Sequence, residues 1–337
     1  MKPTPRLFGT PGSALIPWLR TPVGVAVAIV SALLLAAATA ASTAAAVTAS
    51  APPRVVTTGF PSGGTNPGIF TDTCARAKTA PDDPIMMPGM TGMSMQHDFF
   101  GNPAVNASAT AAALRGGSTT CSTSADASAY WTPVVYQHGE ALTPQRTLLY
   151  WRTRPGTAAT TRTMPQGISL IAGNETATAP QSTSVVNWTC TTGADGHPAA
   201  AGSLPHDCPA GTQLRLVISF PDCWDGHTMD GRDRSGAVYA TAAGCPSSHP
   251  VHIPQLVLHV TYPTSRGDGI TLSTGPHTQG PPVTGHADFI SGWQQNRMDA
   301  DVAACVTAQV RCGPVVGADA TPRGGREPRG SGRRVSP

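Results

Sequence analysis

Charged residues are scarce in this chain. Lys, Arg, Asp and Glu make up 12% of its 337 residues, and aromatic residues make up only 5%. Between residues 54 and 312 there are 14 basic and 17 acidic residues, a net charge of −3, whereas the whole chain carries +3. A mildly acidic body offers no basic face to a phosphate backbone, so we expect no nucleic-acid partner.

Several sequence motifs are also missing. No two cysteines have the Cys-x-x-Cys spacing of a structural zinc site. No Gly-x-Ser-x-Gly turn presents a nucleophilic serine, and no glycine-rich phosphate loop follows a strand pattern. We therefore expect neither this zinc chemistry, nor serine-hydrolase chemistry, nor a nucleotide cofactor.

There is a single long hydrophobic run. Residues 23–41 are uncharged and nearly all apolar, and Arg20 precedes them. This pattern is typical of a Sec-type signal peptide within residues 1–51, and it is also long enough for an uncleaved signal anchor. Both alternatives predict an extracellular or cell-envelope protein, which touches the membrane only through this segment if it is retained.

The chain contains eight cysteines. An even number of cysteines behind an export signal predicts four disulfides, although eight cysteines allow 105 pairings. Proximity in the sequence favours the pairs Cys74–Cys121, Cys190–Cys208, Cys223–Cys245 and Cys305–Cys312.

The rest of the chain predicts a single mainly β domain. A Gly/Pro/Thr-rich linker covers residues 52–69, the globular domain covers 70–313, and a basic tail without hydrophobic pattern, which we expect to be disordered, covers 314–337. Short Val/Ile/Leu-rich segments bounded by Gly, Pro or Asn predict strands at 130–137, 146–152, 168–172, 184–190, 213–220, 255–262 and 270–273. Helical spacing predicts a C-terminal helix at 292–306 and a short one at 104–114. We expect an antiparallel sheet or sandwich, stapled by disulfides, whose long loops carry the polar motifs.

Carboxylates and imidazoles recur in five short motifs. These are Asp83-Pro84-Ile85, Gln96-His97-Asp98-Phe99-Phe100-Gly101-Asn102, Phe220-Pro221-Asp222-Cys223-Trp224-Asp225-Gly226, Cys245-Pro246-Ser247-Ser248-His249 and His286-Ala287-Asp288-Phe289 with Gly292-Trp293. Because such groups are costly to desolvate, their concentration indicates a site. We expect the loops to bring His97, Asp98, Asp222, Asp225, His249, His286 and Asp288 into one cleft.

At these motifs the chain resembles the domain-of-unknown-function family nineteen ninety-six, which occurs in secreted actinobacterial proteins and in fungal proteins with wall-associated WSC modules. The resemblance runs from about Cys74 to Cys312 and implies an architecture but no reaction. One departure concerns Ser94-Met95-Gln96-His97. The family's motif has a second histidine where this chain has Met95, so a site that uses both imidazoles is altered here.

Two classes of function fit these residues. The first is binding or hydrolysis of cell-wall or extracellular glycans. Sugar hydrolysis needs two carboxylates, for which Asp98, Asp222, Asp225 and Asp288 are the candidates, with His97 and His286 as proton relays. Trp131, Trp224, Trp293, His249 and Asn102 are the candidate sugar-binding residues.

The second class is metal binding, although the sequence requires no cofactor. Five of the nine methionines fall within residues 86–95, just before His97. Thioethers together with an imidazole suit Cu(I), which makes Met90, Met93, Met95 and His97 candidate copper ligands. A hard-ion alternative, calcium, would use Asp222, Asp225, Asp230 and Asp233.

Overall fold

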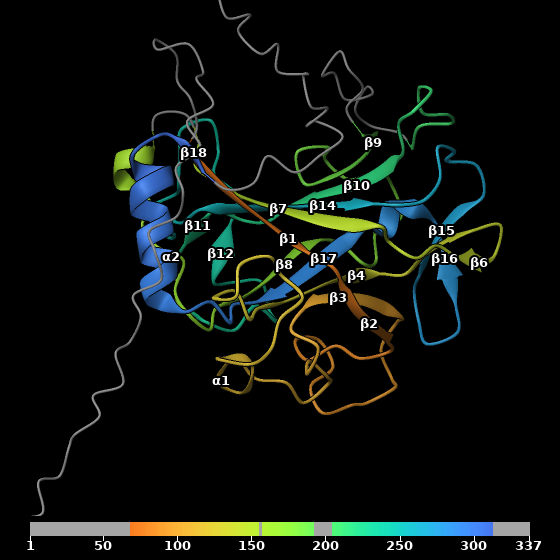
Figure 1. Ribbon diagram of the computed structural model, residues 1–337, viewed down its shortest axis with the longest axis horizontal. Coiled ribbons are helices and arrows are strands. Elements are labelled where there is room, and N and C mark those ends of the chain that lie inside the picture. Colours follow the sequence, from red (N-terminus) through yellow and green to blue (C-terminus); the bar gives the residue numbers. More distant parts are fainter. Residues whose placement is uncertain (1–67, 155–156, 192–203, 313–337) are drawn as a thin grey trace, which may run out of the picture. The chain divides into compact units, whose positions relative to one another are not determined.

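The computed structural model describes residues 68–154, 157–191 and 204–312, and this part is built mainly from antiparallel sheets (Figure 1). The predicted signal segment, most of the linker and the basic tail lie outside the described residues. Among the described residues, no helix is both long and apolar enough to span a bilayer.

The largest sheet has six strands and contains both ends of the described chain. In spatial order its strands are β18 (Arg311–Cys312), β1 (Ile69–Cys74), β7 (Arg146–Arg152), β14 (Gln255–Thr261), β10 (Leu214–Ser219) and β9 (Val186–Cys190). Neighbouring strands are antiparallel, except that β1 and β18 run parallel. The last strand of the domain therefore lies directly beside the first.

A second sheet has five antiparallel strands. In spatial order they are β2 (Arg76–Ala80), β3 (His97–Gly101), β4 (Ala129–Pro133), β17 (His286–Ile290) and β8 (Ser169–Gly173). The strands β3 and β17 both pair with β4, so the two His/Asp motifs lie on either side of one strand.

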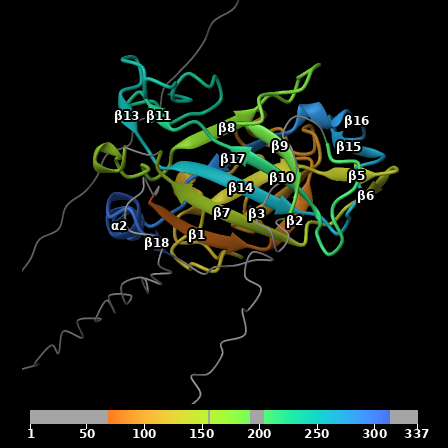
Figure 2. The ribbon, with the colours of Figure 1, turned by 90° about the horizontal axis from the view of Figure 1, so that it is seen from above.

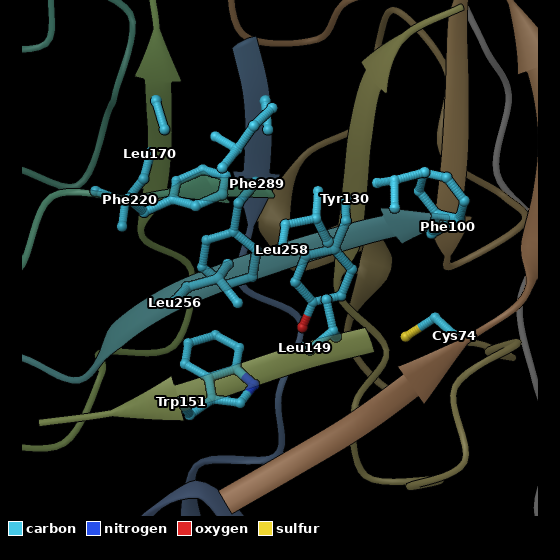
Figure 3. Close-up of a cluster of buried hydrophobic side chains, with 14 of the residues drawn as sticks. Cys74, Phe100, Tyr130, Leu149, Trp151, Leu170, Phe220, Leu256, Leu258 and Phe289 are labelled. Carbon is cyan, nitrogen blue, oxygen red and sulfur yellow. The ribbon is translucent and has the colours of Figure 1, made fainter. Parts of the chain in front are cut away.

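The strands of the two larger sheets overlap when the molecule is seen from above (Figure 2), and the two sheets share one hydrophobic core, part of which Figure 3 shows. Leu149 and Trp151 of β7 and Leu256 of β14 contribute to it from the six-stranded sheet, whereas Tyr130 and Phe289 contribute from the five-stranded sheet. The rings of Trp151 and Phe289 meet edge to face with 5.5 Å between their centroids. Burial of these large side chains is the main favourable term that holds the layers together.

Smaller elements flank the sandwich. They are a four-stranded sheet of β16 (Gln279–Gly280), β15 (Ile270–Ser273), β5 (Val135–Gln137) and β6 (Glu140–Ala141), a three-stranded sheet of β12 (Ala237–Val238), β11 (Cys223–Trp224) and β13 (Val251–His252), the helices α1 (Ala111–Leu114) and α2 (Gln295–Asp301), a π-helical turn (Val302–Thr307), and the 3₁₀ turns Ala158–Thr160 and Pro282–Thr284.

The structure confirms the predicted mainly β class, the C-terminal helix and all four disulfide pairs. Four disulfides indicate an oxidising, extracytoplasmic environment. The helix predicted at 104–114 shortens to α1, because Asn102 and Asn106 accept hydrogen bonds from the backbone N–H groups of Ala104 and Ser108 and favour turns instead.

Two other predictions about the strands were wrong. The single strand predicted at 130–137 is divided between β4 and β5, which belong to different sheets, and the division follows Pro133, which has no N–H to donate. The motifs around His97 and His286 were assigned to loops, but they form the strands β3 and β17.

Candidate functional site

The candidate site lies on the face of the five-stranded sheet that points away from the main core. Side chains alternate between faces along a strand. Along β17, Ala287 and Phe289 enter the main core, so His286 and Asp288 occupy the opposite face. His97 shares that face, because its strand neighbour Phe99 packs on Trp131, the residue paired with Asp288.

His97, His286 and Asp288 converge on this face although 189 positions separate the two histidines in the sequence. One potential ligand atom from each side chain lies within 4.8 Å of the others. The Nε2 atom of His286 lies 3.9 Å from Oδ2 of Asp288. The rings of His97 and His286 stand almost perpendicular, with 5.8 Å between their centroids.

Backbone contacts orient both imidazoles. Nδ1 of His97 lies 2.9 Å from the carbonyl oxygen of Asp82, and Nδ1 of His286 lies 2.9 Å from that of Thr284. A carbonyl only accepts, so Nδ1 carries the proton and Nε2 of each ring keeps its lone pair. Burial lowers the pKa of His97 to about 4 and also lowers that of His286, which keeps both rings neutral at pH 7.

The carboxyl group of Asp288 is buried without a hydrogen-bond partner among the described residues. Its exposed fraction is 1%, and neither carboxyl oxygen accepts a hydrogen bond from any residue that the structure describes. Burial, followed by the charges of Asp83 and Glu175, raises the pKa of Asp288 well above its usual value. Nε2 of His97 is likewise buried without a hydrogen bond among the described residues. Such groups are rare and costly, and they concentrate at functional sites.

A cavity of about 260 Å³ opens above His286 and Asp288. Its charged lining residues are Asp83, Glu175 and Arg234, and Arg234 is ion-paired to Glu175. Three carboxyl groups and one guanidinium thus surround the space, and a cation bound there would favour the ionised form of the carboxyl groups. Its apolar wall is formed mainly by methionines, namely Met86, Met87, Met93 and Met95.

Asp83 belongs to the loop that covers this face of the sheet. Its Oδ1 accepts hydrogen bonds from the backbone N–H groups of Ile85 (2.9 Å) and Met86 (2.8 Å), and these bonds shape the turn that begins the methionine segment. Ile85 packs with Phe99 and Trp131 on the sheet. Burial raises the pKa of Asp83, so the cavity contains two carboxyl groups that resist ionisation.

The expected convergence of seven polar residues in one cleft was wrong. Asp98 follows His97 on β3 and points to the opposite face of the sheet, where it accepts a 2.5 Å hydrogen bond from Thr79 and lies 3.7 Å from Arg76. Asp98 and Asp288 therefore do not face one bond. A one-residue step along a strand reverses the side-chain direction, which a loop assignment could not reveal.

Three further candidates lie outside the cavity lining and have local partners. Asp222 accepts a hydrogen bond of 2.6 Å from Nε of Arg154. Asp225 accepts from the backbone N–H groups of His227 and Thr228 and so closes its own turn. Nε2 of His249 lies 2.6 Å from the carbonyl oxygen of Ser235.

Most of the candidate sugar-binding residues are buried or hydrogen-bonded within the protein. Trp131 and Trp293 have exposed fractions of 0% and 1% and offer no face to a sugar ring. The half-buried Trp224 donates its indole N–H to the carbonyl of Thr228, and the buried Asn102 donates to the carbonyls of Leu114 and Ala127.

Only some of the candidate methionine ligands lie at the cavity. Met93 and Met95 line the cavity, but Met90 does not and is 47% exposed. The predicted site residues did not include Asp83, Glu175 or Arg234. Asp83 belongs to one of the motifs, so the sequence could have indicated it. Glu175 and Arg234 belong to none of the motifs, and only the fold places them at the cavity.

One family of known proteins matches the part of the chain that holds this site. No curated protein matches the chain, and no solved structure matches it. A family model described as a domain of unknown function (DUF1996) matches residues 83–293, which is more than half of the chain and includes Asp83, His97, His286 and Asp288. The chain therefore belongs to this family, as the sequence motifs indicated.

Proposed function

We propose that this protein is an extracytoplasmic metal-binding protein that holds a transition-metal ion with His97, His286 and Asp288. The observation that carries the proposal is the buried carboxyl group of Asp288, which has no hydrogen bond among the described residues and lies beside two lone-pair imidazole nitrogens. Each buried group left unsatisfied costs about 1–3 kcal/mol. One cation would satisfy all three groups at once.

The ligand set indicates the class of ion. Two imidazoles and one carboxylate suit iron(II), zinc, copper or nickel, whereas calcium and magnesium prefer oxygen ligands alone. Ligand atoms around such an ion lie roughly 3 Å apart, so side chains now within 4.8 Å would move together by about 1–2 Å. The hydrogen bonds from Nδ1 to backbone oxygens are the usual support for a histidine ligand.

The test measures binding of cobalt(II), a coloured probe for such sites, to the full chain exported into an oxidising compartment and purified without chelator. We expect about one ion per chain. The variant Asp288→Asn should lose more affinity than the roughly 10- to 100-fold that loss of a supporting residue costs. Asp98→Asn is the matched control, because Asp98 is also buried in the same sheet but faces the other side.

Two results would overturn the proposal. One is the absence of stoichiometric binding by the wild-type chain. The other is equal cobalt(II) affinity in the wild-type chain and the Asp288→Asn variant.

A second candidate function, glycan binding with hydrolysis, is favoured by a different observation. Asp83 and Asp288 line one cavity and both have raised pKa values, and a glycosidase needs one carboxyl group that stays protonated to act as the acid. This function would use Asp83 in the role that Asp98 cannot fill.

Cell-wall polysaccharide fragments test this candidate. Chelator-treated protein should release reducing ends from at least one of them, and Asp83→Asn and Asp288→Asn should each abolish that release while Asp98→Asn keeps it. If the wild-type chain neither binds nor cleaves any fragment, glycans are not its ligands.

A further inference from the structure

The loop between β2 and β3 contains a methionine segment, residues 86–95, that faces the proposed metal site. Two glycines with positive φ, Gly89 (75°) and Gly92 (77°), turn the segment. The backbone N–H of Met87 donates to the carbonyl of Asp83, and that of Gly92 donates to the carboxyl group of Asp82. The carbonyl of the same Asp82 orients His97, so the segment and the site share a support.

The methionines are placed against the usual preference for burial. Across the residues that the structure describes, the exposed large hydrophobic side chains are Met86 (39%), Met90 (47%) and Met93 (56%), all from this segment. Met86 and Met93 line the cavity as well, and Met87 and Met95 line it from less exposed positions. In the described part of the chain the other large apolar side chains are buried or half-buried, and thioethers are open to solvent at this one place.

We propose that the methionine segment makes this site selective for Cu(I), which is held between the imidazoles of His97 and His286 and at least one thioether of the cavity wall. The inference rests on the proposed metal site and identifies its ion. Soft thioether sulfur prefers Cu(I) to the divalent ions that imidazole and carboxylate alone accept. Because thioethers are neutral, they add affinity without adding charge to a cavity that already holds three carboxyl groups.

The exposed positions give the ion an entry route. Met86 and Met93 are accessible from solvent and share the cavity with His286 and Asp288, so an arriving Cu(I) ion meets sulfur first and imidazole afterwards. No change in oxidation state is needed in this sequence of contacts. The alternative role of the methionines is an adaptable apolar wall for an organic ligand, which sulfur-to-carbon substitution would leave largely intact.

The test compares Cu(I) and cobalt(II) affinities of methionine-to-leucine variants of the full chain. Cu(I) affinity is measured anaerobically with ascorbate, in competition with bathocuproine disulfonate, and leucine is used because it nearly conserves side-chain volume. The quadruple variant Met86→Leu/Met87→Leu/Met93→Leu/Met95→Leu, which removes every thioether of the cavity wall, should lose roughly 10- to 100-fold in Cu(I) affinity while its cobalt(II) affinity stays unchanged. Met90→Leu is the matched control, because Met90 belongs to the segment but does not line the cavity.

X-ray absorption of the Cu(I)-loaded wild-type chain gives a second measurement that does not depend on any variant. We expect both sulfur and nitrogen neighbours around copper. Unchanged Cu(I) affinity in the quadruple variant, or a copper shell without sulfur, would overturn the inference. The metal site itself would still stand if cobalt(II) binding depends on Asp288, so the two failures are distinguishable.

Discussion

The carboxyl group of Asp126 illustrates how a single buried residue sets the pH dependence of stability. It is buried beside Asp72 and accepts hydrogen bonds from the hydroxyl of Tyr130 (2.7 Å) and the backbone N–H of Ser128 (3.0 Å). Burial, and then the charge of Asp72, raises its pKa to about 7. The folded state therefore binds a proton that the unfolded state has released between its usual pKa of 3.8 and about 7.

It follows that this residue's contribution to stability is full below the unfolded pKa and is lost as the pH rises through about 7. We expect Asp126→Asn to reduce the loss of unfolding free energy between about pH 4 and pH 8 by on the order of 3 kcal/mol. Urea denaturation of both proteins at several pH values measures this. Identical pH dependence in the two proteins would contradict the assignment of the proton to Asp126.

At the scale of the element, strand β3 ends at a position that only glycine can occupy. Gly101 has a φ of 84°, and a Cβ atom there would lie 2.3 Å from the carbonyl oxygen of Ser128. We expect Gly101→Ala to lower the unfolding free energy by about 2–4 kcal/mol, because the backbone at Ser128, just before β4, must move. Thermal unfolding provides the measurement.

Gly116 supplies the matched control for that substitution. Its φ of 71° is similar, but a Cβ atom there would have nothing within 4 Å. Gly116→Ala should therefore cost only the conformational strain, about 1 kcal/mol. Equal losses in the two variants would show that the close approach to Ser128 contributes nothing.

The elements also show how much the sequence could predict. Strands of the six-stranded sheet such as β7 and β14 are rich in Val, Leu and aromatics, and their predicted ranges agree closely with the observed ones. The strands β3 and β17 carry His and Asp on one or both faces, so a rule based on apolar content assigned them to loops.

The sequence motifs also predicted only part of the candidate site. The motifs pointed to His97, His286 and Asp288, and the fold brought these three together. They also pointed to Asp98, whose direction depends on strand register. Glu175 and Arg234 come from segments without a motif, and their place at the cavity follows from tertiary packing alone.

At the scale of the whole molecule, the four disulfides close chain segments of very different length. Cys74–Cys121 links β1 to a residue 47 positions later, whereas Cys305–Cys312 joins the π-helical turn to β18 across 7 positions. Removing a cross-link restores conformational entropy to the unfolded chain. This lowers the unfolding free energy by about 4 kcal/mol for the long loop and about 2 kcal/mol for the short loop. We expect alanine replacement of the first pair to be the more destabilising, as measured by urea denaturation.

The short cross-link makes a separate contribution that the entropy of the unfolded chain does not include. It holds β18 parallel to β1, and β1 otherwise has β7 as its sheet neighbour. Alanine replacement of Cys305 and Cys312 should therefore increase amide hydrogen exchange in β1 and β18 while the centre of the sheet, β14 and β10, remains protected. If exchange rises equally in all four strands, β18 unfolds together with the rest of the sheet and the prediction is wrong.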